Sequence, residues 1–194
     1  MTDIEKKAWD YAKKAHEGVF RKFTHIPYFE GHVIKVYEIL KKYDKDPKLG
    51  AASLLHDTLE DDPNTTYEKL SNLFGEEITN LVVELTSDNS KIKEMGKGPY
   101  LLQKMQNMSV GALEIKLADR RHNIEDCLNA SDSFKFKYYH ETRFIINNLI
   151  NSRELNEIHL LLIGEINGIL GLLQSENKYE SMVLSFDKFS KQNK

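Results

Sequence analysis

Residues 47–61 read PKLGAASLLHDTLED, and this stretch indicates both the fold class and the place to look for chemistry. Its first part is mostly small or apolar and opens with Pro47, which is typical of a buried helix. Its last part carries four titratable side chains, those of His56, Asp57, Glu60 and Asp61. Burying such groups is costly unless partners or a metal ion satisfy them. We therefore predict a helix over about residues 47–59 that ends in a polar site.

Helical patterns extend outward from this stretch in both directions. Apolar residues recur at helical spacing over about residues 4–15, 28–43, 67–73, 76–85, 99–108, 110–123, 134–149 and 155–174, with a weaker segment after residue 177. The polar, glycine-bearing stretch over residues 87–98 is typical of a surface loop. Since no series of strand patterns interrupts the helical ones, the sequence predicts an all-α fold of about nine to eleven helices.

The composition narrows the class of protein. The chain has 194 residues, 40% apolar and 29% charged, as expected for a folded domain. Its 27 basic and 30 acidic residues give a net charge of −3, so no overall basic field attracts nucleic acid. The single cysteine, Cys127, fits a reducing compartment, and neither a signal peptide nor an uninterrupted apolar run is evident. We expect one cytoplasmic domain over residues 1–194, with neither nucleic acid nor membrane as a partner.

The titratable cluster suits metal-assisted hydrolysis. His56 and Asp57 are adjacent and can bind one cation, while the two acids one helical turn further on can face bound water or substrate. Other segments must complete the coordination sphere: His32 opens an apolar helical pattern, and Asp119 follows the mostly apolar run IKLA. Two imidazoles and two carboxylates suit Mn²⁺ or Fe²⁺ better than Ca²⁺, and do not point to structural zinc.

Each candidate ligand also has a purely structural explanation. His32 taken alone is better explained as a half-buried histidine, and Asp119 as an ion partner of Arg120 or Arg121. The acidic residues 60–62 are explained as a polar helix end before a proline. The structural interpretation requires all of these explanations to hold together, for residues that occur in this order beside apolar runs. A shared metal site is the simpler interpretation.

The order of His32, His56-Asp57 and Asp119 resembles the HD superfamily of metal-dependent phosphohydrolases. The surrounding motifs are AHEG (15–18), RK (21–22), PY (27–28), ED (60–61), FG (74–75), LT (85–86), KLADR (116–120) and HN (122–123). Together they resemble the hydrolase domain of RelA/SpoT-type alarmone enzymes, and most of all the stand-alone small alarmone hydrolases, including the metazoan type.

This resemblance implies an HD-domain helical bundle. Its motif-bearing core would cover about residues 4–150, and C-terminal helices over 151–194 would complete the domain. The implied activity is Mn²⁺-dependent removal of pyrophosphate from the 3′ position of guanosine tetra- or pentaphosphate, (p)ppGpp, leaving GDP or GTP. One Mn²⁺ ion, or another divalent transition metal, would be held by His32, His56, Asp57 and Asp119.

The resemblance also assigns roles around the metal. Glu60 and Asp61 would orient or deprotonate the attacking water. Arg21 and Lys22 would pack on the purine or its phosphates, and Asn123 would hydrogen-bond the sugar or a phosphate. Without the resemblance, the basic pair is better explained as a solvated surface feature.

Three further residues are weaker candidates for substrate contacts. Lys97 and Tyr100 flank the glycine-bearing stretch, from which they can reach phosphates, although decoration of a loop explains them equally well. Related hydrolases line the pocket with a helix that corresponds to the one carrying Tyr138, Tyr139 and Arg143, from which we take Tyr139 as a contact.

Three functions fit these residues. The first is a (p)ppGpp 3′-pyrophosphohydrolase. The second is an HD phosphohydrolase for another phosphorylated nucleotide, such as an NADPH 2′-phosphatase or a nucleotide phosphatase. The third, a non-catalytic nucleotide-binding HD domain, requires the loss of a ligand or of the acid pair, and here all of them are present. The sequence fits a monomer or a small homo-oligomer.

Overall fold

The computed structural model describes the backbone of residues 1–192 and the side chains of residues 1–174. Over that range the fold is helical, with eleven α-helices, one π-helical turn and one 3₁₀ turn. The described residues contain no strand, and one isolated β-bridge joins Phe20 and Pro27. The predicted all-α class and number of helices are confirmed.

The N-terminal half contains six α-helices and the π-helical turn. They are α1 (Asp3–Ala15), η1 (Phe29–Val33), α2 (Ile34–Tyr43), α3 (Pro47–Leu55), α4 (Thr58–Asp61), α5 (Tyr67–Phe74) and α6 (Glu76–Leu85). The C-terminal half contains α7 (Asn89–Met95), α8 (Lys97–Asn107), α9 (Val110–Asp126), η2 (Cys127–Asn129), α10 (Asp132–Ile150) and α11 (Glu157–Gln192).

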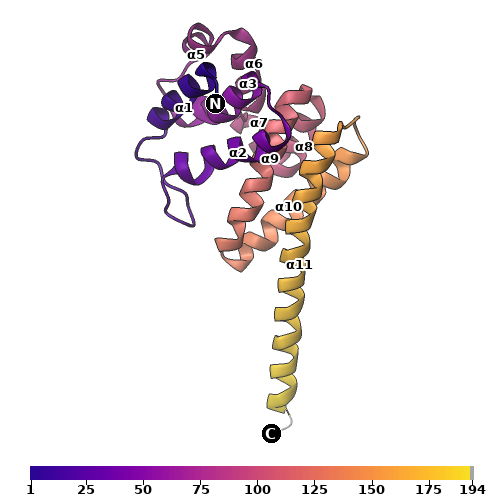
Figure 1. Cartoon of the computed structure of the whole chain (residues 1–194). Coiled ribbons are helices and arrows are strands. Elements are labelled where there is room, and N and C mark those ends of the chain that lie inside the picture. The colour runs from indigo at the N-terminus through magenta and orange to yellow at the C-terminus, as the bar shows by residue number, and fades with distance from the viewer. Residues whose placement is uncertain (193–194) are drawn as a thin grey trace.

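Helix α9 is the centre of the fold. It contacts α2, α3 and α6 from the N-terminal half and α10 and α11 from the C-terminal half (Figure 1). Its leucines and isoleucines are fully buried, and the Ser109 side chain caps its N-terminus by accepting a hydrogen bond from the amide of Ala112. Because α9 is packed on so many sides, polar residues along it are held in fixed positions.

The helix predicted over residues 47–59 is interrupted at His56 and Asp57, because α3 ends at Leu55 and α4 begins at Thr58. Two side chains cause the interruption by binding carbonyls of the last turn. His56 Nδ1 lies 2.7 Å from the carbonyl oxygen of Ser53, and Thr58 Oγ1 donates to that of Leu55 at 2.8 Å. The prediction of one continuous helix was therefore wrong at its polar end.

The stretch over residues 87–98 is also more ordered than predicted, because it contains α7 and the start of α8. Asp88 caps α7 by accepting hydrogen bonds from the amides of Ser90 and Lys91. Gly96, with φ of 81°, separates the two helices, a conformation that glycine adopts without strain. The prediction of a surface loop was wrong because the Asp88 cap was overlooked.

Helix α11 packs on α9 and then continues away from the other helices (Figure 1). Its Leu162, Ile166 and Leu173 belong to the core. By length and composition alone, its segment Glu157–Gln174 is apolar enough to cross a membrane, and a third of that segment is buried in the fold. Packing on α9 accounts for part of this hydropathy, since the core helix of a folded domain has the same composition.

The segment between α1 and η1 folds back on itself and carries Arg21 toward α9. Two backbone hydrogen bonds hold it, from Arg21 N to Ile26 O and from Tyr28 N to Val19 O, both at 2.8 Å. Gly31 makes room for it, because a Cβ atom there would lie 3.1 Å from both Arg21 and Ile26.

Candidate metal centre

Four side chains from three segments converge on one point between η1, α9 and the break after α3. His32 Nε2 lies 3.2 Å from His56 Nε2 and 3.3 Å from Asp119 Oδ1. Asp57 Oδ2 lies 2.9 Å from His56 Nε2 and 3.6 Å from His32 Nε2. Donor atoms about 2.1 Å from one transition-metal ion lie roughly 3–3.5 Å from each other, so these separations fit a shared ion.

The hydrogen bonds behind both imidazoles direct Nε2 toward this point. The Nδ1 atom of His56 faces the carbonyl oxygen of Ser53, which can only accept, so in the neutral ring this nitrogen carries the hydrogen and Nε2 has its lone pair for a cation. His32 Nδ1 faces Nδ1 of His122 at 2.9 Å. Both rings are buried, and His32 lies in the π-helical turn, a feature common at functional sites.

The two carboxylates are held from outside as well. Tyr28 donates its hydroxyl to Asp57 Oδ2 at 2.6 Å. Lys116 Nζ donates to Asp119 Oδ2 at 2.9 Å, and Asn123 Nδ2 donates to Asp119 Oδ1. Partners of this kind fix the direction in which a carboxylate presents its free lone pairs.

The electrostatics match a site built for a cation. Burial disfavours the charged form of Asp57, but the neighbouring imidazoles outweigh it and hold the pKa of Asp57 well below its usual range. The pKa of Asp119 is lowered in the same way, with the ammonium of Lys116 as the largest opposing influence. Burial would lower the pKa of His56, yet the carboxylates raise it to about 9. Positive charge is therefore stabilised at this point.

The two acids predicted to handle water lie at different places. Glu60 borders the same small cavity as His32, Asp57 and Asp119, and its Oε1 accepts a hydrogen bond from the amide of Ser87 at 2.7 Å. Although its side chain is exposed, desolvation by the surrounding protein raises the pKa of Glu60, and the charge of Asp57 adds to this shift.

Asp61 points to the other side, into the neighbouring cavity. Its Oδ2 lies 3.5 Å from Nε2 of the buried His16, whose Nδ1 faces the carbonyl oxygen of Ala12. The His16 ring stacks on Tyr28 with 5.1 Å between ring centroids. Asp61 is thus linked through two rings to Asp57, but it does not border the metal-site cavity.

Two adjoining cavities form the candidate substrate site. The first, about 160 Å³, is bordered by His32, Asp57 and Asp119 of the metal site and by Glu60. The second, about 380 Å³, contains Arg21, Lys22 and Asp61. Four residues border both cavities, namely Tyr28, Lys97, Asn123 and Tyr138.

Arg21 is already held in place on the wall of the second cavity. It donates to Asp126 at 2.6 Å and to Asn123 at 3.0 Å, and its guanidinium lies 5.4 Å from the centroid of the Tyr28 ring. Lys22 lies over the rings of Phe23 and Phe134. The structure therefore brings Arg21, Lys22 and Asn123 to the wall of one cavity, and their contacts with substrate stay predictions.

Tyr100 and Tyr139, which the sequence analysis took as substrate contacts, border neither cavity. Tyr100 is buried and borders a different surface groove beside α6 and α7, where its hydroxyl accepts a hydrogen bond from the amide of Asp88. Tyr139 turns the other way on α10 and donates its hydroxyl to Gln174. Its neighbour Tyr138 lies in the site instead, with the guanidinium of Arg120 over its ring.

Sequence reasoning assigned no role to Tyr28, Lys116 or His122, which hold the metal-site residues in place. All three lay within motifs that it quoted. Lys116 and His122 are three residues before and after Asp119, so helical spacing puts them on its face of α9. That spacing was the signal that could have found them.

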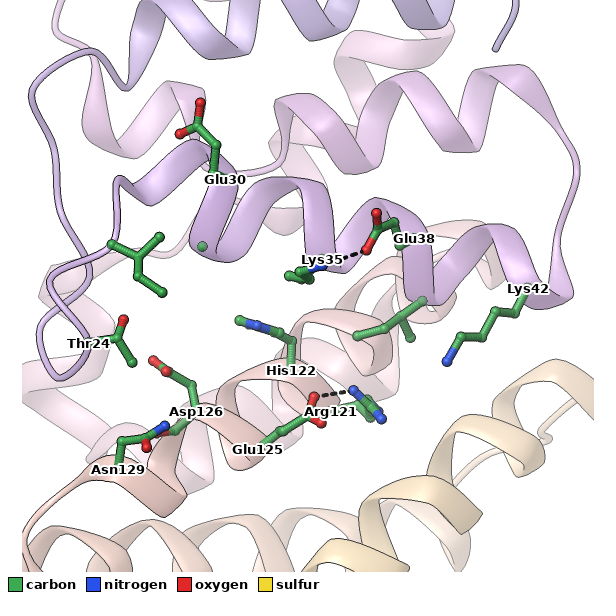
Figure 2. Close-up of a pocket in the computed structure, with 13 residues that line it drawn as sticks. Thr24, Glu30, Lys35, Glu38, Lys42, Arg121, His122, Glu125, Asp126 and Asn129 are labelled. Carbon is green, nitrogen blue, oxygen red and sulfur yellow. Dashed lines mark hydrogen bonds and ion pairs between the residues drawn. The ribbon is translucent and has the colours of Figure 1, made fainter.

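A larger cavity of about 530 Å³ lies behind the metal centre, between α2 and α9 (Figure 2). It contains none of the predicted site residues. Among the charged groups on its wall, Lys35 pairs with Glu38 and Arg121 pairs with Glu125. His122 borders it and connects it to the metal centre.

The fold and this centre define the class of the protein. The model of the HD domain family matches residues 8–154, most of the chain, and the chain belongs to this family. Among curated relatives, a guanosine-3′,5′-bis(diphosphate) 3′-pyrophosphohydrolase of Spiroplasma citri is 31% identical over 188 residues, covering 89% of this chain and 24% of the relative. The guanosine-3′,5′-bis(diphosphate) 3′-pyrophosphohydrolase MESH1 of Xenopus tropicalis is 31% identical over 122 residues, covering 62% of this chain and 67% of the relative.

A solved structure described as "A metazoan ortholog of SpoT hydrolyzes ppGpp and plays a role in starvation responses" has the same fold. The TM-score is 0.74 at 24% identity, over 89% of this chain and 96% of that chain. The bacterial relative is longer, since this chain spans about a quarter of it. The predicted relationship to RelA/SpoT-type hydrolases, including the metazoan type, is confirmed.

Proposed function

We propose that this chain is a metal-dependent (p)ppGpp 3′-pyrophosphohydrolase, which converts ppGpp to GDP and pppGpp to GTP with release of pyrophosphate. The observation that carries the proposal is the convergence of His32, His56, Asp57 and Asp119 beside the free carboxylate oxygen of Glu60. Its support is the chain's membership of the HD domain family and its similarity to proteins named for this reaction.

The resident ion that we propose is Mn²⁺, held by these four side chains. Two imidazole nitrogens and two carboxylate oxygens suit Mn²⁺ and its divalent neighbours, while Ca²⁺ prefers oxygen alone. When bound, such an ion lowers the pKa of water and offsets negative charge on the phosphate being attacked.

Glu60 handles the attacking water in this proposal. One of its oxygens is occupied by the amide of Ser87, so the other is available to accept a proton from water. Its raised pKa makes it a stronger base than an ordinary glutamate. Hydrolysis adds the elements of water across the bond between phosphorus and the ribose 3′ oxygen, so pyrophosphate leaves and the 3′-hydroxyl is restored.

The wall of the second cavity binds the nucleotide in this proposal. Arg21 presents a planar cation beside Tyr28, which suits a base or a phosphate. Lys97 and Lys116 border the first cavity and place positive charge where the 3′-diphosphate would lie.

A single domain over residues 1–194 and a cytoplasmic location remain predictions.

A panel of phosphorylated nucleotides tests the function. The purified chain should convert ppGpp to GDP and pyrophosphate, and pppGpp to GTP, with added Mn²⁺ and not after treatment with a chelator. NADPH and deoxynucleoside triphosphates are assayed as alternative substrates. Faster Mn²⁺-dependent turnover of one of these would replace the proposed substrate, and no turnover of any nucleotide would reject the enzyme.

A further inference from the structure

The metal centre has a second imidazole pair behind it. His122 on α9 and His32 in η1 face each other with 2.9 Å between their Nδ1 atoms, and both side chains are buried. A hydrogen bond between two ring nitrogens contains one hydrogen, so one ring must donate and the other must accept.

The surroundings of His32 decide which ring donates. Its Nε2 faces the carboxylates of Asp57 and Asp119, where the proposed cation binds. A neutral imidazole that offers the lone pair of Nε2 to a cation carries its hydrogen on Nδ1. His32 is then the donor, and Nδ1 of His122 is the acceptor. His56 has the same arrangement, with the carbonyl oxygen of Ser53 as its acceptor.

We propose that His122 is a positioning residue of the metal centre: its Nδ1 accepts the Nδ1 hydrogen of His32 and so sets the tautomer and ring orientation with which His32 binds the cation. This role rests on the metal binding proposed above. An acceptor behind a ligand imidazole raises its basicity and fixes its orientation, and losing one costs about 10–100-fold in metal affinity.

On the side away from His32, His122 faces charged groups of a cavity wall. The ring borders the large cavity, where Asp126 is already paired with Arg21, and Arg121 with Glu125 (Figure 2). The carboxylates of Glu38, Glu125 and Asp126 on this wall are therefore each paired with a cation. Because Nδ1 of His122 accepts the hydrogen bond from His32 in this proposal, the ring hydrogen of His122 lies on Nε2.

Asparagine and leucine at this position form a matched pair for the test. The amide oxygen of asparagine occupies nearly the position of Nδ1 of histidine, while leucine has a similar shape without an acceptor. Titration calorimetry of metal-free full-length protein with Mn²⁺ gives the dissociation constant of each. We expect His122→Leu to bind about 10–100-fold more weakly than wild type, and His122→Asn to recover most of that loss.

The thermal unfolding of the metal-free variants should be alike, which separates this role from a general packing role. Equal Mn²⁺ affinity of His122→Leu and wild type, or equal losses in both variants, would overturn the positioning role alone. No Mn²⁺ binding by wild type would instead reject the metal centre and the proposed function. If His122→Leu does not fold, the ¹⁵N spectrum of the Zn²⁺-loaded wild type decides: a hydrogen on Nδ1 of His32 supports the role, and one on Nε2 overturns it.

Discussion

Glu60 and Ser87 are joined by a hydrogen bond of 2.7 Å from the amide of Ser87 to Oε1 of Glu60. This contact ties α4 to the start of the segment that leads into α7. It also fixes the carboxylate at the edge of the metal-site cavity, with its second oxygen left for chemistry. Lys104 supports the same segment by donating to the carbonyl oxygen of Thr86 at 2.6 Å.

Replacing Glu60 by glutamine separates this anchoring from catalysis. Glu60→Gln retains an oxygen for the amide of Ser87 but loses the basic carboxylate, so kcat should fall by about 100-fold or more. Mn²⁺ affinity should stay within a few-fold of wild type. Glu60→Ala, which also loses the anchor, is the comparison. Unchanged turnover by the glutamine variant would remove this residue from the mechanism.

Replacing Arg21 should act on substrate binding. Arg21→Ala removes the guanidinium beside Tyr28, so we expect KM to rise about tenfold with a smaller change in kcat. Arg143→Ala is the control, because Arg143 donates to Tyr139 outside both cavities. Steady-state kinetics with ppGpp checks both. An unchanged KM in Arg21→Ala would show that Arg21 does not bind substrate and serves only as the ion partner of Asp126.

Lys97 provides a test of phosphate attraction, because it borders both cavities. Lys97→Gln should raise KM by roughly 3–10-fold at low salt, and the difference should shrink as salt screens the charge. Lys93→Gln, at an exposed position of α7 outside both cavities, should leave KM unchanged. Equal effects of the two substitutions at every salt concentration would show that only net charge matters.

Glu114 should make the free energy of unfolding depend on pH. It is buried on α9 and accepts a hydrogen bond from Asn156, and burial raises its pKa from 4.5 to about 7. The folded protein therefore keeps a proton that the unfolded chain loses. Its free energy of unfolding should fall as pH rises from about 4.5 to 7, then level off.

Substitution by glutamine removes this dependence while retaining the acceptor for Asn156. At pH 8 we expect Glu114→Gln to be more stable than wild type by about 1–3 kcal/mol, with the difference vanishing near pH 4. Urea unfolding at several pH values measures it, with the exposed Glu94→Gln as the control. A difference that grows toward low pH would contradict the assignment.

The sequence was sufficient for the fold class and for selecting the ligand candidates, because apolar periodicity and a charged group beside an apolar run are local signals. His32, His56, Asp57 and Asp119 each lie beside the start or the end of such a run. Their convergence could not be derived from spacing, since it depends on how η1, α3 and α9 pack.

The sequence predictions that were wrong depended on the directions in which side chains point. Adjacent residues on a helix point about 100° apart, so the choice between Tyr138 and Tyr139 depends on the rotation of α10, which a sequence pattern specifies poorly. The break at His56 arises from side chains that bind the carbonyls of Ser53 and Leu55, a competition that outweighs helix propensity locally.

Metal stoichiometry tests the central claim most directly. Titration calorimetry of the chelator-treated protein with Mn²⁺ should give one ion per chain. Asp57→Asn and Asp119→Asn should each weaken that binding by about 100-fold or more and lose ppGpp hydrolysis in parallel, because an anionic ligand disappears. Full Mn²⁺ binding with intact, Mn²⁺-dependent hydrolysis in either variant would contradict the claim that these side chains share one cation.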